Sequence, residues 1–141
     1  MGMTFGSVEW VAAYKDAINA SAAYKSAAAN WTHGVVALIV LANPPSFPQD
    51  AGIWLDLDRG VCREAKLVSV DEAKKAPFCI SGDYARWKQV VRKELDPIKG
   101  MMQGKLRLKG DLPTIVRAVR ASQELVNSSG SVDTVFSDET A

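Results

Sequence analysis

Two short runs, Glu94-Leu95-Asp96-Pro97 and Gly104-Lys105-Leu106-Arg107-Leu108-Lys109-Gly110-Asp111-Leu112, carry the most specific structural signals in this sequence. The first is typical of a turn or a short helix that starts at the proline. In the second, two leucines alternate with basic residues, which is the period-2 pattern of a strand with one solvent-facing side. Gly110 favours a sharp turn. We expect Asp111 to accept hydrogen bonds from the free N–H groups of the helix that follows.

Upstream of these runs the sequence predicts a leading helical region and a buried strand. Residues 8–29 are rich in alanine, and Ser7 is a suitable N-cap for a helix there. A break near Asn19-Ala20-Ser21 divides this region into two helices. Residues 31–42 contain a continuous apolar, β-branched run, which is typical of a strand buried on both faces.

The middle of the chain predicts a hairpin and a fourth strand. Residues 53–57 alternate between apolar and polar side chains, Asp58-Arg59-Gly60 favours a turn, and residues 61–68 return as the partner strand. Residues 71–75 are a connector or a short helix. Residues 77–81 are expected to form another strand.

The last third predicts two helices around the strand at 105–109. One begins at Gly82-Asp83, and the other spans 112–126 with apolar residues at helical spacing. Residues 127–141 are rich in Ser, Asp and Thr and indicate a polar tail, so the expected domain covers 1–126. The element order predicts an α+β fold with one largely antiparallel sheet and helices mainly on one side.

Length and charge restrict the function classes. A chain of 141 residues is one domain by size, and its net charge of +1 argues against a dedicated nucleic-acid binder. The charge is uneven, since ten Lys or Arg residues lie within 86–120. This basic surface is either an ordinary solvated face or a patch that transiently contacts anionic lipid headgroups on a membrane.

Metal and catalytic chemistry find little support in the sequence. Cys62 and Cys79 form no metal-binding pair and are expected to be reduced, half-buried strand residues, and His33 is the only histidine. Asp56 and Asp58 are two residues apart on a predicted strand, so they share one face. A solvent-exposed strand face accounts for both residues better than a catalytic pair of carboxylates does. No signal peptide is visible and the apolar run at 35–42 is too short to span a bilayer, so the expected location is the cytoplasm.

A set of motifs in the second half of the chain is similar to those of the sterol carrier protein (SCP) sterol-transfer domain family. They are a strand ending in glycine, an inward tryptophan, Leu-Asp-Pro, Gly-Lys-Leu and Gly-Asp. In this chain they are Ile80-Ser81-Gly82, Trp87, Leu95-Asp96-Pro97, Gly104-Lys105-Leu106 and Gly110-Asp111. The motifs cover about a third of the chain, and the predicted element order resembles the family over nearly its whole length.

The resemblance implies a sheet of roughly five strands covered by helices, with a hydrophobic tunnel under the C-terminal helix. It implies lipid ligands such as fatty acids, acyl-CoA, sterols or isoprenoids, and neither a catalytic residue nor a cofactor nor a metal. A lipid site needs an apolar lining. The candidate lining residues are Trp87, Val90, Val91, Ile98, Met101, Met102, Leu112, Ile115, Val116 and Val119.

Two interpretations remain open. In the first, the protein binds and transfers lipids inside the cell in this tunnel. In the second, the same fold has a filled core and acts as a structural or regulatory interaction module, through an oligomer such as a homodimer or through a partner enzyme. Enzymatic activity is not expected in either.

Overall fold

The computed structural model describes residues 2–139, and its centre is a five-stranded sheet. The strands are β2 (Val36–Leu41), β3 (Ala51–Asp58), β4 (Val61–Val68), β5 (Phe78–Asp83) and β6 (Arg107–Lys109). They lie in the order β4-β3-β2-β5-β6, and every neighbouring pair is antiparallel except β2–β5. This is the predicted α+β fold with its largely antiparallel sheet.

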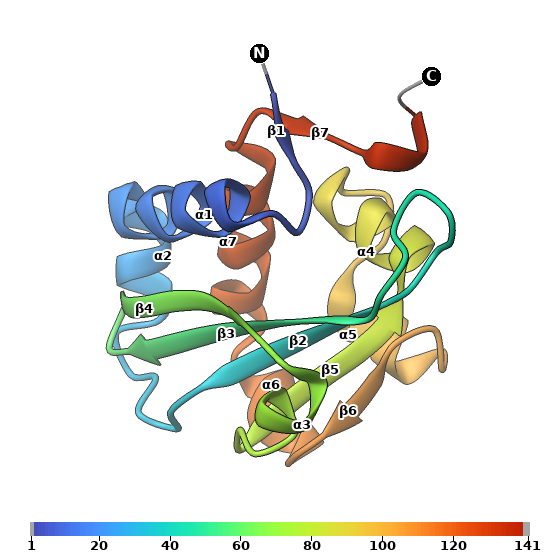
Figure 1. The fold of residues 1–141 in the computed structure, drawn as a ribbon. Helices are drawn as coiled ribbons and strands as arrows, with labels where there is room; N and C mark the ends of the chain where they lie inside the picture. The colour runs from blue at the N-terminus through green and yellow to red at the C-terminus, as the bar shows by residue number, and fades with distance from the viewer. Residues whose placement is uncertain (1, 140–141) are drawn as a thin grey trace.

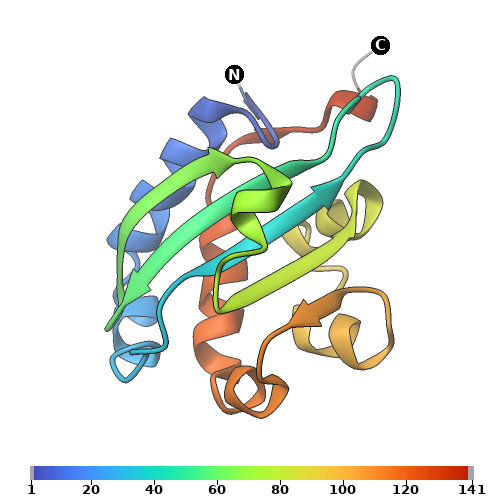
Figure 2. The same ribbon diagram turned by 60° about the horizontal axis from the view of Figure 1, so that its bottom comes forward.

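Most helices cover one face of this sheet (Figure 1). They are α1 (Val8–Ala20), α2 (Ala22–Ala27), α4 (Tyr84–Val91), α5 (Pro97–Met102), α6 (Leu112–Arg117) and α7 (Val119–Gly130). The short helix α3 (Val70–Ala73) crosses the opposite face (Figure 2). Within residues 2–139, no helix is both long and apolar enough to cross a bilayer.

The two leading helices form as the sequence predicts. The Ser7 hydroxyl accepts a hydrogen bond from the Trp10 N–H at 3.1 Å, which caps α1. Ser21 then ends α1 and caps α2 by accepting from the Tyr24 N–H at 3.0 Å. The predicted break is therefore one serine that serves both helices.

The predicted hairpin is also present. Arg59 and Gly60 both have positive φ, 50° and 86°, which is the backbone of the tight turns that join right-twisted strands. β3 and β4 pair on either side of this turn, with an irregularity between Asp56 and Leu57. The predicted buried strand, β2, lies at the middle of the sheet with a partner on each side.

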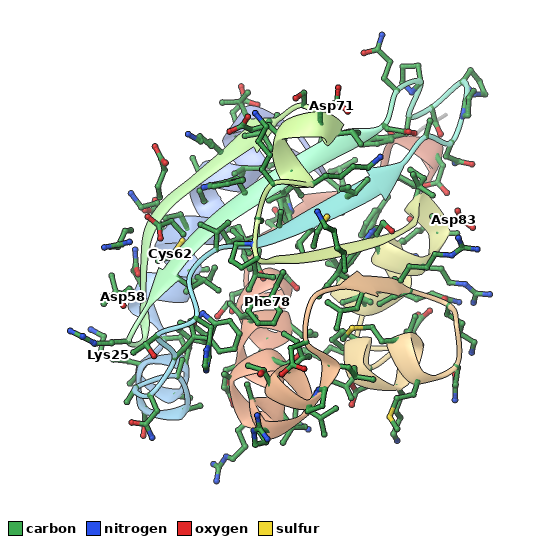
Figure 3. The ribbon with its side chains drawn as sticks, turned by 90° about the horizontal axis from the view of Figure 1, so that it is seen from below. Lys25, Asp58, Cys62, Asp71, Phe78 and Asp83 are labelled. Atoms are coloured by element: carbon green, nitrogen blue, oxygen red, sulfur yellow. The ribbon has the colours of Figure 1, made fainter. Side chains whose placement is uncertain are left out.

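Strand alternation divides the core into two unequal parts. Residues such as Val36, Val40 and Ile53 face the helix-covered side and belong to the main core. Ala37, Cys79 and their neighbours face the other side, where a small cluster lies under α3. Figure 3 looks onto that second side.

The C-terminal helix differs from the prediction. Residues 112–126 do not form one helix, because Ala118 adopts φ −96° and ψ 32° and separates α6 from α7. Asp111 occupies the N-cap position of α6, yet its side chain accepts from the Thr114 hydroxyl and makes no hydrogen bond to a helix N–H. The expected cap at Asp111 is therefore wrong, and the helix changes direction at residue 118.

Residues 127–139 pack back onto the domain, so no boundary is visible at residue 126. α7 continues to Gly130, and β7 (Thr134–Val135) then pairs in parallel with β1 (Met3–Thr4). Phe136, 4% exposed, lies beside Phe5 and Tyr84. The last described residues therefore close over the end of the domain next to α4.

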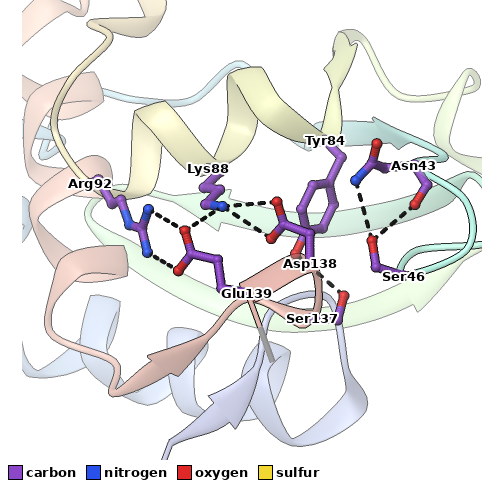
Figure 4. A network of polar contacts seen from close by, with 8 residues as sticks. All are labelled: Asn43, Ser46, Tyr84, Lys88, Arg92, Ser137, Asp138 and Glu139. Carbon is purple, nitrogen blue, oxygen red and sulfur yellow. Dashed lines mark hydrogen bonds and ion pairs between the residues drawn. The ribbon is translucent and has the colours of Figure 1, made fainter. Parts of the chain in front are cut away.

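Ion pairs hold this C-terminal segment in place (Figure 4). Lys88 bonds to Asp138 at 2.9 Å, and both Lys88 and Arg92 bond to Glu139. The two basic side chains also lie against the Phe136 ring, with the Arg92 guanidinium carbon 4.8 Å from its centroid. We call these five residues the C-terminal clasp.

Candidate functional site

An apolar chamber of about 70 Å³ lies between the covered face of the sheet and helices α1, α4 and α7. Its floor is formed by Val36, Leu38 and Val40 of β2, with Ile53 and Leu55 of β3 beside them. These positions alternate along their strands, which is why a single face supplies them all.

A second apolar chamber of about 60 Å³ lies further along the same face. Tyr24 of α2 and Trp31 close one side, Leu57 of β3 forms part of the floor, and Met101 of α5 and Ile115 of α6 close the other side. Both chambers are lined almost entirely by apolar groups, so they suit hydrocarbon better than a polar metabolite.

The two chambers adjoin. Val36 and Ile80 of the sheet, and Ser122 and Leu125 of α7, line both of them. The two chambers therefore lie next to one another under α7, with these four side chains between them.

The inner face of α7 carries small and polar side chains that sequence reasoning passed over. Ser122, Val126 and Ser129 line the first chamber with Leu125. The Ser129 hydroxyl donates to the Val126 carbonyl of the same helix at 2.6 Å, so its hydrogen is already bonded and does not point into the chamber. These four residues have the i, i+3, i+4 and i+7 spacing of one helix face, which could have identified them from the sequence. Because two of the four are serines, the pattern did not indicate an apolar lining.

Hydrogen bonds fix the walls of the first chamber. The Tyr14 hydroxyl donates to the Leu125 carbonyl at 3.0 Å and joins α1 to α7, and burial raises the pKa of Tyr14 far above its ordinary value. The Trp87 indole N–H donates to the Ile39 carbonyl at 2.8 Å and joins α4 to β2. Both aromatic side chains thus keep their polar atoms satisfied while their rings line the chamber.

A groove of about 170 Å³, lined by both polar and apolar side chains, opens next to the first chamber, between the α4–α5 turn and α7. Pro97 and Val126 line both the groove and the chamber. Lys93, Asp96 and Gln123 supply polar groups to the groove, together with other side chains. Two apolar side chains, Pro97 and Val126, therefore lie between this groove and the first chamber.

The structure brings together part of the predicted lining. Trp87, Val90 and Val91 line the first chamber, and Met101 and Ile115 line the second. Ile98 is buried in the main core without lining either chamber.

Four predicted lining residues lie at the surface. Met102 is 69% exposed, and Leu112, Val116 and Val119 are 37–41% exposed, and none of them lines either chamber. The prediction treated 112–126 as one helix with one apolar face. Because the chain turns at Ala118, only Ile115 of α6 points inward, and α7 presents a different face.

The basic surface of 86–120 is partly neutralised, which the sequence did not reveal. Lys88 and Arg92 pair with the acidic residues of the C-terminal clasp. The Arg92 guanidinium, with Lys88 beside it, lowers the pKa of the Glu139 carboxyl to about 2. The patch available to an anionic surface is smaller than the count of basic residues suggests.

The cysteines carry no sign of reactivity. Cys62 and Cys79 are free and lie on β4 and β5, as predicted, but both are buried and not half-buried as expected. Burial raises the pKa of the Cys62 thiol to about 11 and raises that of Cys79 as well. Across residues 2–139, no three His, Cys, Asp or Glu side chains gather as metal ligands would.

Comparison with known proteins agrees with this geometry. The model of the SCP-2 sterol transfer family matches residues 14–120, which is most of the chain. The chain belongs to the SCP-2 sterol transfer family. The predicted family resemblance is thereby confirmed, and membership supports a general role in binding and transferring lipids.

Solved structures of the SCP-2 type resemble this chain closely. A crystal structure of sterol carrier protein 2 has 35% identity and a TM-score of 0.80, covering 91% of this chain and 98% of the other. A conserved hypothetical protein of Thermus thermophilus, described as a candidate sterol carrier protein, has 36% identity and a TM-score of 0.83, covering 95% and 93%. Palmitated SCP2L2 of Aedes aegypti, at 15% identity, a TM-score of 0.52 and coverage of 79% and 93%, shares the fold. A search among curated proteins gave no match.

Proposed function

We propose that this SCP-2 family protein is a lipid carrier and not an enzyme, and that it holds one hydrocarbon chain in the two adjoining chambers under α7. The observation that supports this most is the shared lining at Val36, Ile80, Ser122 and Leu125, which would let one chain pass from the first chamber into the second. An elongated apolar path suits a single acyl or isoprenoid chain better than a fused ring system.

The energetics allow such binding without specific polar contacts. Burying sixteen methylene-sized groups contributes on the order of 12 kcal/mol at about 0.8 kcal/mol each. An affinity near 1 μM corresponds to about 8 kcal/mol. The remaining 4 kcal/mol or so is available for ordering the chain and for opening the protein, which is at the low end of association costs.

Binding requires the path to widen. Chambers of about 70 and about 60 Å³ are much smaller than the roughly 300–1,000 Å³ of typical ligand pockets. α7 is the element to move, because it lines both chambers and lies on the surface of the molecule (Figure 1). We propose that α7 lifts from the sheet when a lipid is taken up.

A second candidate function is the interaction module with a filled core. The small volume of the two chambers favours it, since a core of this kind needs no ligand for stability. In that case an apolar surface outside the chambers would contact a second copy or a partner enzyme.

Native mass spectrometry of protein purified without detergent separates the two candidates. The carrier predicts a bound lipid near one per chain, identified after organic extraction, or stoichiometric uptake when palmitic acid is titrated into the apo protein. An apo mass that is unchanged by palmitic acid, cholesterol and a polyisoprenoid would reject the carrier and favour the interaction module.

A cytoplasmic location, brief contact with anionic membranes and a homodimer stay predictions. The exposed basic residues that the C-terminal clasp does not use, such as Arg107 and Lys109 on the edge strand β6, are the groups through which membrane contact would occur. Sedimentation with vesicles containing anionic lipid, at low and high salt, tests this directly.

A further inference from the structure

The groove between the α4–α5 turn and α7 has the position and chemistry of a headgroup site. Its volume is about 170 Å³, and Pro97 and Val126 are all that it shares with the first chamber. Displacing these two apolar side chains would join the groove to the hydrocarbon path. A lipid chain in the chambers would then place its polar end among the groove residues.

Lys93 provides the positive charge at this position. It follows α4 with φ 62°, in the left-handed region that glycine adopts most easily. The Lys93 N–H bonds to the Val90 carbonyl at 3.0 Å and the Glu94 N–H to the Gln89 carbonyl at 2.8 Å, which together form a Schellman cap. The cap needs only the backbone of residue 93, so the lysine side chain is not there to end the helix.

The Lys93 side chain reaches across the groove to α7. A Cβ built on Gly130 would lie 3.4 Å from Lys93 Cε and 4.0 Å from its Nζ. Gly130 follows Gln123 and Val126 on one face of α7, so this face and Lys93 border the same groove. The Lys93 ammonium therefore lies at the edge of the groove, about one helical turn along α7 from Val126, which separates the groove from the first chamber.

The charge of Lys93 has no counter-ion among residues 2–139, whereas Lys88 and Arg92 on the preceding helix are both paired. Asp96 also lines the groove and keeps its negative charge, but its Oδ1 accepts from the Ile98 N–H at 2.9 Å to cap α5, and it forms no ion pair with Lys93 among the described residues. The groove thus combines the unpaired Lys93 with the amide side chain of Gln123, while the Asn127 amide, which also lines it, already donates to Glu124 Oε1 at 3.2 Å. The Lys93 ammonium and the Gln123 amide are the donors that a carboxylate requires.

We propose that this groove is the mouth of the lipid path and that Lys93 binds the carboxylate of a single-chain fatty acid there. The proposal rests on the carrier function and deepens it, since it assigns the ligand class and the direction in which the ligand lies. The carboxylate stays at the α4–α5 turn, and the hydrocarbon runs past Leu125 towards the second chamber.

The test compares palmitate with 1-hexadecanol, which has the same chain length and no charge, by titration calorimetry at low ionic strength. We expect Lys93→Met to weaken palmitate binding about tenfold and leave hexadecanol binding unchanged, since only a charge-assisted hydrogen bond is lost. Lys93→Arg should retain palmitate binding. Lys99→Met, an exposed lysine on α5 outside the groove, is the matched control and should bind both ligands as the wild type does.

Lys93→Gly tests whether weaker binding comes from loss of folding. Glycine adopts the left-handed backbone of residue 93 without strain, so this variant should melt at the wild-type temperature or higher. It should still bind palmitate as weakly as Lys93→Met does. Equal palmitate affinity in the wild type and Lys93→Met, or equal loss of both ligands, overturns the headgroup site and leaves the carrier function standing. A wild type that binds neither ligand overturns both.

Discussion

Ser122 and Leu125 are the residues at which the two chambers meet. Both line each chamber, and the Leu125 carbonyl also accepts the Tyr14 hydroxyl at 3.0 Å. In the proposed path, this turn of α7 therefore lies at the junction of the two chambers, opposite Val36 and Ile80. A small serine at this place leaves room that a larger side chain would fill.

Replacing Ser122 by Phe should block the path. The ring would occupy the junction of the two chambers, so we expect palmitate binding to fall at least about tenfold, while stability changes by no more than about 1–3 kcal/mol, as for other enlargements of a packed core. Titration calorimetry and urea denaturation measure the two effects. Arg120→Phe, an exposed position on the same helix, is the control and should leave palmitate binding unchanged.

The two apolar residues on either side of the break at Ala118 differ in burial, so the stability cost of truncating each can be compared. Ile115 is 6% exposed and Val119 is 39% exposed. We expect Ile115→Ala to cost about 2–3 kcal/mol of unfolding free energy and Val119→Ala to stay within about 0.5 kcal/mol. Equal costs in urea denaturation would mean that the two side chains are equally buried, contrary to the placement of α6 and α7.

At the scale of elements, the C-terminal segment is attached to α4 by charge as well as by packing. The Glu139 carboxyl lies between Lys88 and Arg92 (Figure 4). Both basic side chains also lie over the Phe136 ring. α4 also supplies Trp87, Val90 and Val91 to the first chamber. The C-terminal clasp thus supports a helix that forms a wall of the path.

The C-terminal clasp should weaken in acid. Arg92 and Lys88 lower the pKa of Glu139 from 4.5 to about 2, so the ion pairs contribute fully above pH 4.5 and are lost as the pH falls towards 2. Carboxyl resonances followed by NMR should show Glu139 titrating near pH 2. A midpoint near 4.5 would mean that these pairs do not form in solution.

The same contact can be removed at neutral pH. Glu139→Gln keeps the shape of the side chain but loses its charge, so we expect faster hydrogen exchange at the β1–β7 pairing, for example at the Phe5 N–H that bonds to the Val135 carbonyl at 2.9 Å. Glu64→Gln, a change of the same kind at an exposed site on β4 away from the clasp, should leave this exchange rate unaltered.

At the scale of the whole molecule, a ligand that enters between sheet and helices should stabilise the fold. Palmitate at 100 times its dissociation constant would add about 2.7 kcal/mol, which corresponds to a rise in melting temperature of about 10 °C for a domain of this size. Differential scanning calorimetry with and without palmitate measures it. An unchanged melting temperature at saturating palmitate would count against binding to the folded state.

Local patterns were enough to predict most elements. Ser7 as a cap, the break at Ser21, the Arg59-Gly60 turn and the alternation in β3 and β4 are confirmed, because each depends on residues close together in the sequence. The motifs from Ile80 to Asp111 also indicated the family. Of the candidate site, the residues of α4 together with Met101 and Ile115 do line the chambers.

The sequence by itself determined most of the element types, their order and the α+β class, because cap chemistry, turn geometry and side-chain periodicity act over a few residues. Only the tertiary structure decided the direction of α7, the exposure of Val116 and Val119, the inward position of Ser122 and Ser129, and the pairing of Glu139 with Lys88 and Arg92. These features arise from contacts between distant segments. The packing of α7 over the sheet selects which helix face lies inward, and no local pattern contains that choice.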